Sequence, residues 1–162
     1  MKKVLLTLGV LALFSESKAQ GTLAKNDAQI NAGFGLSTYG LPVYGGFDYG
    51  LGKNFTIGAE GAYRGYKNFG YRFSIISIGV NGNYHFNEIL KLPAQFDFYA
   101  GLNLTYFNWS SPRGYVGSYA SELGLGLQVG GRYFFNDQFG INLELGGGSA
   151  LSGGKVGITV KL

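Results

Sequence analysis

The most constraining feature of this sequence is a regular alternation of residue types in its C-terminal third. From Ser121 to Gly147 almost every second residue is apolar, and the residues between are mainly Gly, Asn, Gln or charged, with one interruption at 136–138. A period of two places successive side chains on opposite faces of a β-strand. The stretch therefore predicts a β-hairpin with one apolar face and one small or polar face.

The rest of the chain repeats this alternation, in segments long enough to cross a bilayer as tilted strands. The expected strands are residues 28–36, 43–51, 55–64, 76–86, 96–106, 122–135, 139–146 and 155–162. Because successive strands run in opposite directions, an even number of strands brings both ends of the chain to the same end of the sheet, here called one side. We expect tight turns at 52–54 and 136–138 and the longer connection 87–95 on that side, and loops at 66–72 and 108–119 on the other.

The apolar face has the composition of a surface that meets lipid. It carries mostly Leu, Ile, Val, Ala, Phe and Gly, and charged residues make up only 14% of the chain, against about 25% in an ordinary soluble domain. A secreted lipocalin-like barrel, the soluble alternative, would bury this face and expose the opposite one, which is too rich in Gly and too poor in Lys and Glu to be a good water-facing surface. The sequence therefore predicts an all-β fold, an eight-stranded antiparallel up-and-down transmembrane β-barrel with its small and polar face inside.

Aromatic residues gather at the ends of the expected strands, as they do where a membrane barrel crosses the two interfaces. One set lies near the turns on the side of the chain ends: Phe55, Tyr84, Phe86, Phe96, Tyr133, Phe135 and Phe139. A second set lies near the loops of the other side: Tyr63, Tyr66, Phe73, Tyr106 and Trp109. We interpret the two sets as interfacial girdles.

The N-terminal segment has the features of a secretory signal peptide, which we assign to residues 1–19. Two lysines are followed by an apolar run at 4–14 and by a small-x-small end at 17–19, so cleavage is expected before Gln20. The apolar run is too short to span a bilayer as a helix, and the alternative is an N-terminal core helix. The interpretation predicts export, a barrel domain at residues 20–162, and localisation in the bacterial outer membrane.

With these features in place, the chain resembles the small outer-membrane β-barrels of the OmpX and OmpA transmembrane-domain type. The resemblance covers residues 20–162 and includes an assembly signal in the last strand, formed by Lys155, Gly157, Val160 and Leu162. Leu162 stands where this family usually has an aromatic residue. The resemblance implies insertion by the barrel-assembly machinery.

The inward face carries charges of both signs, which points to a salt-bridged polar interior. These residues are Asp48, Glu60, Arg64, Asp97, Glu122, Arg132, Glu144, Lys155 and Lys161. Unpaired buried charge is costly, and an eight-stranded barrel has just enough interior for its side chains to fill. We therefore expect internal ion pairs, with Asp48, Asp97, Arg132 and Lys161 toward the periplasmic end. A narrow ion pathway is the alternative, because inward glycines leave space for water.

Neither enzymatic nor metal chemistry is indicated. The chain has one histidine, His85, and no cysteine, so a zinc site lacks ligands, and a hydrolase would depend on an inward histidine far from the outer leaflet. We expect His85 to fill the lumen. No cofactor motif is present, and the net charge of +4 without a basic run gives no support for nucleic-acid binding.

The sequence thus favours a structural or interaction protein of the cell envelope rather than an enzyme. The expected outer loops hold the contact candidates Tyr66, Lys67, Phe69, Tyr71, Arg72, Trp109, Arg113 and Tyr115. Outer-membrane lipid, lipopolysaccharide phosphates or a surface ligand are the expected partners. Two alternatives remain: an accessory subunit of a larger outer-membrane complex, packed through the outward glycines Gly45, Gly61 and Gly82, and a narrow pore for ions or small solutes.

Overall fold

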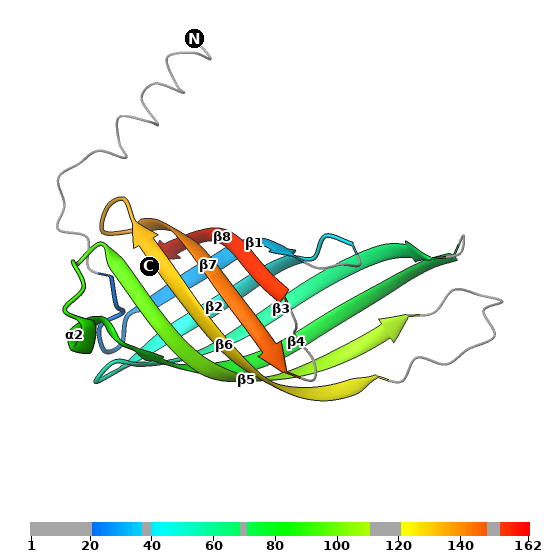
Figure 1. The fold of residues 1–162 in the computed structure, drawn as a ribbon, viewed down its shortest axis with the longest axis horizontal. Helices are drawn as coiled ribbons and strands as arrows, with labels where there is room; N and C mark the ends of the chain where they lie inside the picture. The colour runs from blue at the N-terminus through cyan, green and yellow to red at the C-terminus, as the bar shows by residue number, and fades with distance from the viewer. Residues whose placement is uncertain (1–20, 37–39, 69–70, 111–120, 149–152) are drawn as a thin grey trace, which may run out of the picture.

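The computed structural model describes residues 21–36, 40–68, 71–110, 121–148 and 153–162. These residues form a closed barrel in which each strand pairs antiparallel with the next and the last pairs with the first (Figure 1). The strands are β1 Ala28–Leu36, β2 Val43–Gly52, β3 Phe55–Asn68, β4 Tyr71–His85, β5 Phe96–Ser110, β6 Glu122–Phe134, β7 Phe139–Gly148 and β8 Gly153–Lys161. The predicted eight-stranded up-and-down barrel is confirmed.

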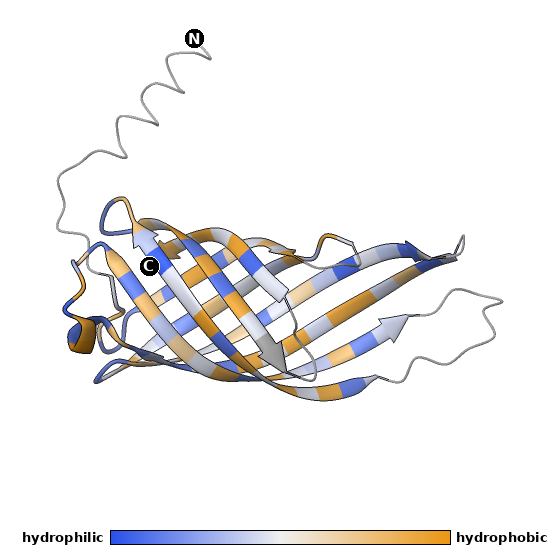
Figure 2. Cartoon of the chain, viewed as in Figure 1, coloured by the Kyte–Doolittle hydropathy of each residue, from blue (hydrophilic) through white to orange (hydrophobic). Residues whose placement is uncertain are grey.

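The barrel carries most of its apolar side chains outside and most of its polar side chains inside. Ile78 is 67% exposed and Leu123 is 65% exposed, whereas Gln29 and Thr159 are fully buried. Figure 2 shows the same alternation as bands of opposite hydropathy along the strands. Closure pairs the backbone groups of every strand on both sides, so the fold leaves no open sheet edge around its girth. No helix among the described residues is long and apolar enough to cross a membrane.

The two ends of the barrel differ. At one end, here called the α2 end, the connection from β4 to β5 contains the short helix α2, Asn87–Leu90, which the alternation did not predict. The Asn87 side chain bonds to the backbone of Phe96 and Phe98 and fixes this connection to β5. Residues 21–27 also pack at this end: Leu23 is buried, and Asn26 and Asp27 exchange backbone hydrogen bonds with Gly50.

At the opposite end, here called the hairpin end, β3 and β4 extend beyond their neighbours (Figure 1). Their pairing continues from Phe55 opposite Tyr84 to Asn68 opposite Tyr71. The predicted loop at 66–72 is therefore too long, because β3 continues to Asn68 and β4 begins at Tyr71. The predicted loop at 108–119 likewise begins too early, since β5 runs to Ser110. Residues 1–19 and the loop candidates Phe69, Arg113 and Tyr115 lie outside the described residues.

Aromatic and apolar side chains are also found inside the barrel, at both of its ends. Phe73, assigned from the sequence to the outer girdle, is buried at the hairpin end together with Ile75 and Phe107. The Phe73 ring stacks on the Tyr66 ring, with the two ring centroids 5.3 Å apart. Phe134 is fully buried at the α2 end. Tyr66 and Trp109, assigned to the same girdle, are the direct cross-strand partners of Phe73 and Ile75 and share their inner face. These three girdle assignments are therefore wrong, because the parity of the strands carries the residues to the inner face.

Candidate functional site

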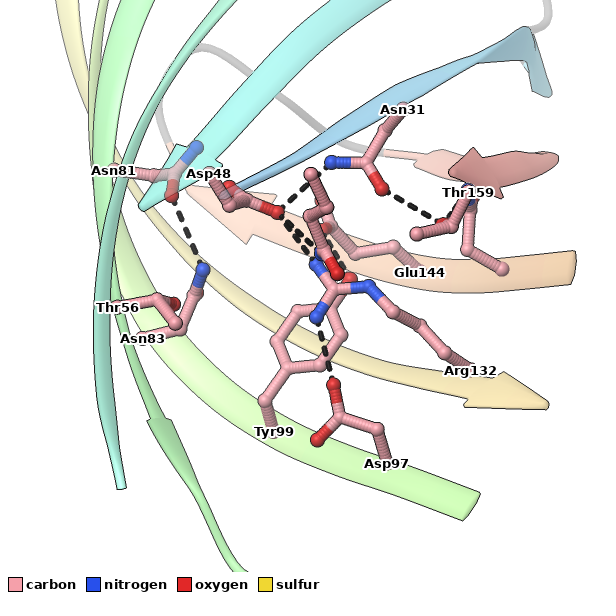
Figure 3. A network of polar contacts seen from close by, with 12 residues as sticks. Asn31, Asp48, Thr56, Asn81, Asn83, Asp97, Tyr99, Arg132, Glu144 and Thr159 are labelled. Atoms are coloured by element: carbon pink, nitrogen blue, oxygen red, sulfur yellow. Dashed lines mark hydrogen bonds and ion pairs between the residues drawn. The ribbon is translucent and has the colours of Figure 1, made fainter. Parts of the chain in front are cut away.

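Inside the barrel, the Arg132 guanidinium joins two carboxylates from different strands (Figure 3). Nη1 of Arg132, on β6, donates to Asp97 Oδ2 on β5 at 2.8 Å, and Nη2 donates to Asp48 Oδ2 on β2 at 2.8 Å. The guanidinium also lies over the Tyr99 ring, 4.3 Å from the ring centroid. All three charged groups are buried. We call Asp48, Asp97 and Arg132 the Arg132 cluster.

Uncharged side chains add further hydrogen bonds to the Arg132 cluster, although Arg132 Nε itself has no hydrogen-bond partner among the described residues. Asp48 Oδ2 also accepts hydrogen bonds from the side-chain amides of Gln29 and Asn31 on β1. The Asn31 side chain is held in turn by Thr159 of β8, whose hydroxyl donates to Asn31 Oδ1 at 2.7 Å. The cluster thus spans strands on opposite sides of the lumen, and its charges meet partners in place of water.

A second ionic cluster lies nearer the hairpin end. Lys155 Nζ on β8 lies 2.6 Å from Glu60 Oε2 on β3 and 2.8 Å from Glu144 Oε1 on β7. We call these three residues the Lys155 cluster. Tyr99 connects the two clusters, because its hydroxyl donates to Glu144 Oε2 at 2.8 Å while its ring contacts Arg132. One bonded system therefore crosses the lumen at two levels.

The remaining charged residues predicted for the interior lie outside these clusters. Lys161 Nζ is placed over the Phe134 ring, 4.1 Å from the centroid, at the α2 end. Glu122 is exposed at the start of β6. Arg64 lines the cavity above the Lys155 cluster. The structure therefore brings together six of the nine predicted residues: Asp48, Asp97, Arg132, Glu60, Glu144 and Lys155.

Space in the lumen is limited. A cavity of about 90 Å³, large enough to hold water, lies above the Lys155 cluster and is bordered by Arg64, Ser77 and Thr105. Between the two clusters the space falls to about 20 Å³. The Arg132 cluster lies below it, so the geometry suits a closed cup rather than a channel.

One constellation resembles the arrangement of a hydrolase. Thr56 Oγ1 lies 3.0 Å from His85 Nε2, and His85 Nδ1 lies 2.6 Å from Asp97 Oδ1. The sequence did not group these residues, because they come from three different strands. Each is at most 2% exposed, neither lumen cavity is lined by Thr56 or His85, and Asp97 is already bound to Arg132. No substrate can reach the Thr56 hydroxyl, so the three residues link β3, β4 and β5.

Metal binding finds no support in the described part of the chain. No group of three or more His, Cys, Asp or Glu side chains in it could hold a metal ion.

The contact candidates at the hairpin end lie on strands. Lys67 and Arg72 face each other across the β3–β4 pair, and the parity of the strands points both outward. A hollow of about 420 Å³ lies against this face, bordered by Tyr63, Gly65, Tyr66, Lys67, Arg72, Phe73 and Ser74. Tyr71 is exposed near the tip, and Trp109 on β5 pairs with Ile75.

Comparison with known proteins identifies the architecture but no relative in sequence. No family model matches the chain. No curated protein matches it either. Among solved structures, the chain is similar to the outer membrane protein OprG from Pseudomonas aeruginosa, with a TM-score of 0.68 and 13% identity over 89% of this chain and 99% of that one. The chain has the fold of a small outer-membrane β-barrel.

Two further structures share this fold. The N-terminal β-barrel domain of Pseudomonas aeruginosa OprF has a TM-score of 0.62 and 17% identity over 86% of this chain and 100% of that one. Neisserial surface protein A has a TM-score of 0.60 and 17% identity over 84% of this chain and 95% of that one. At such identities the likeness concerns the architecture alone, so the function is argued from the side chains of this chain.

Proposed function

We propose that this chain is an exported protein of the bacterial outer membrane that acts as a structural and interaction barrel. The α2 end faces the periplasm, the hairpin end faces outside, and the lumen is closed. The apolar outward wall and the signal peptide expected at residues 1–19 support this proposal. In this orientation, Phe55, Phe96 and Phe139 lie at the inner interface, and Tyr63 and Tyr106 lie at the outer one.

The observation that carries the proposal is the position of Arg132 between Asp48 and Asp97, across the lumen. An ion crossing the barrel would have to displace this buried group. Leaving one member of such a pair without its partner costs about 3–5 kcal/mol. The barrel therefore acts through its surfaces rather than through a pore.

The hairpin end offers the surface for contact with other envelope components. The exposed residues Lys67, Tyr71 and Arg72 are assigned this role, and they combine aromatic and basic groups suited to lipopolysaccharide or a surface ligand. Tyr66 and Trp109 share the inner face with Phe73 and Ile75 and are left out of it. During insertion, Lys155, Gly157, Val160 and Leu162 of the C-terminal segment serve as the signal to the barrel-assembly machinery.

Cysteine labelling tests the location and the orientation. The chain has no cysteine, so each single-cysteine variant carries one thiol, and any labelling comes from the substituted position. In intact cells, Lys67→Cys at the hairpin end should react with a membrane-impermeant maleimide, and Lys53→Cys in the β2–β3 turn should react only after the outer membrane is permeabilised. Labelling of Lys53→Cys in intact cells, or recovery of the chain in the soluble fraction, would contradict the proposal.

A second candidate, an accessory subunit of a larger complex, is favoured by one feature of the outer wall. Gly45 and Gly61 lie directly opposite each other, next to Ala32 on β1, and the space above both glycines is open. Such a row lets a neighbouring barrel approach closely. Native electrophoresis of the chain extracted in mild detergent, followed by mass spectrometry of the band, distinguishes a free barrel from one with reproducible companions.

A further inference from the structure

The outward face of the β3–β4 hairpin carries a charge arrangement that the barrel itself does not neutralise. Lys67 and Arg72 are direct cross-strand partners. Like charges at opposed positions of an antiparallel pair destabilise it. Neither residue forms an ion pair with any described residue. An anion between the two side chains would turn this repulsion into attraction.

The space for such an anion lies directly below the pair. Gly65 and Ser74 are the next outward partners toward the barrel wall. Gly65 has no side chain, and Tyr63 Oη lies only 3.4 Å from the position that a Gly65 Cβ would occupy. The Tyr63 ring therefore lies over the Gly65 backbone, and the hollow of about 420 Å³ at this point is bordered by both. Hydroxyl donors stand beside it on Tyr63 and Ser74.

The position of the hollow along the strand identifies the kind of anion. Tyr63 is paired with Ile76, and Ile78 and Val80 continue the exposed apolar wall below them. Lys67 lies four residues beyond Tyr63, which corresponds to about 13 Å along a strand and about 10 Å along the axis of a barrel tilted by about 40°. The basic pair thus lies just above the apolar wall, at the depth of lipid headgroups.

The two basic side chains are chemically suited to a phosphate group. The Arg72 guanidinium can donate two parallel hydrogen bonds to phosphate oxygens, and the Lys67 ammonium adds a compact charge. In the orientation proposed above, this end lies in the outer leaflet, whose phosphorylated glycolipid is lipopolysaccharide. We propose that Lys67, Arg72, Ser74 and Tyr63 form a binding site on the outer wall for a phosphate of the lipid A part of lipopolysaccharide. The choice of lipid rests on the proposed function.

Binding to the purified, folded full-length barrel in detergent micelles tests this site without depending on its orientation in a membrane. Native mass spectrometry would measure adducts with lipid A that carries its phosphates and with lipid A from which they have been removed. The Lys67→Gln/Arg72→Gln variant should bind phosphorylated lipid A about ten-fold more weakly than the unmodified chain, because two charge-assisted contacts are lost. Dephosphorylated lipid A should bind both proteins equally weakly.

A matched control removes two positive charges from the other end of the barrel. Lys53 and Lys91 are exposed and have positive φ angles, which asparagine tolerates. The Lys53→Asn/Lys91→Asn variant should retain the affinity of the unmodified chain. The proposal would be overturned by equal losses of affinity in both variants, by dephosphorylated lipid A binding the unmodified chain as tightly as phosphorylated lipid A does, or by inorganic phosphate binding as tightly as lipid A. If the lipid A binding test fails but Lys67→Cys is labelled in intact cells, only the lipid A site is overturned, and the proposed function stands.

Discussion

Arg132 Nη2 lies 2.8 Å from Asp48 Oδ2, although 84 residues separate the two in the chain. The bond joins β6 to β2, which are not neighbours in the barrel, so it runs across the lumen. Hydrogen bonds of the wall hold each strand only to the next one. Side-chain bonds across the lumen brace opposite walls, and the same bonds close the interior.

Removal of the Arg132 side chain should destabilise the folded barrel. Arg132→Ala leaves Asp48 and Asp97 buried without their cation, which is expected to cost about 3–5 kcal/mol. Urea unfolding in lipid vesicles, followed by the gel mobility shift between folded and unfolded barrel, measures this change. Arg72→Ala removes an exposed guanidinium and should stay within about 0.5 kcal/mol of the unmodified chain. Equal stability of the two variants would show that the cluster does not brace the barrel.

Alanine should destabilise the barrel at one of two adjacent glycines of β6 and be tolerated at the other. A Cβ at Gly130 would overlap the Tyr99 ring, which contacts Arg132 and bonds Glu144. Gly130→Ala should therefore cost about 1–3 kcal/mol. Gly131→Ala points outward, where the nearest atom is 3.8 Å away, and should be nearly neutral. Unfolding free energies of the two variants compare the faces directly, and a reversed order would contradict the position of Tyr99.

In the Lys155 cluster, the stability lost on removal of the lysine should be recovered when the two carboxylate charges are removed as well. Lys155→Met leaves the Glu60 and Glu144 carboxylates close together without their cation. Converting both to glutamine in the same chain removes the repulsion and should recover most of the lost stability. Denaturant unfolding of the single, double and triple variants makes the comparison. A triple variant no more stable than Lys155→Met would mean that Lys155 acts through packing alone.

The Thr56, His85 and Asp97 constellation should be structural. Thr56→Val keeps the shape of the side chain and removes its hydrogen bond to His85, at a cost of about 1 kcal/mol. Fatty-acid release from lipid vesicles containing the folded protein should equal that from empty vesicles, with or without the substitution. Hydrolysis that disappears in Thr56→Val would instead make the constellation catalytic.

The sequence predicts the barrel well because a period of two is a property of each strand alone. Parity also places the charges of Arg132, Asp97 and Asp48 on the inner face. Contacts between strands that are not neighbours depend on the stagger of the closed barrel, which no single strand encodes. The bond from Tyr99 on β5 to Glu144 on β7 is of this kind, as is the bond from Arg132 on β6 to Asp48 on β2.

Aromatic runs limit the prediction in a different way. Tyr133, Phe134 and Phe135 are all aromatic, so hydropathy does not reveal which of them points inward, and only the parity of the flanking residues does. Phe73 and Arg72 lie beyond the apolar wall, where a charged and aromatic stretch has the composition of a loop. There the strand pairing of the hairpin persists and carries Phe73 inside and Arg72 outside.

Conductance of the folded barrel in planar lipid bilayers tests the closed lumen most directly. With the amount of inserted folded protein verified, the unmodified chain should give no discrete single-channel steps, because the Arg132 and Lys155 clusters cross its lumen. Arg132→Ala, recorded in parallel, should introduce brief openings. Discrete steps from the unmodified chain, altered by Glu60→Gln or Arg64→Gln, would show that ions pass through the barrel and would contradict the account.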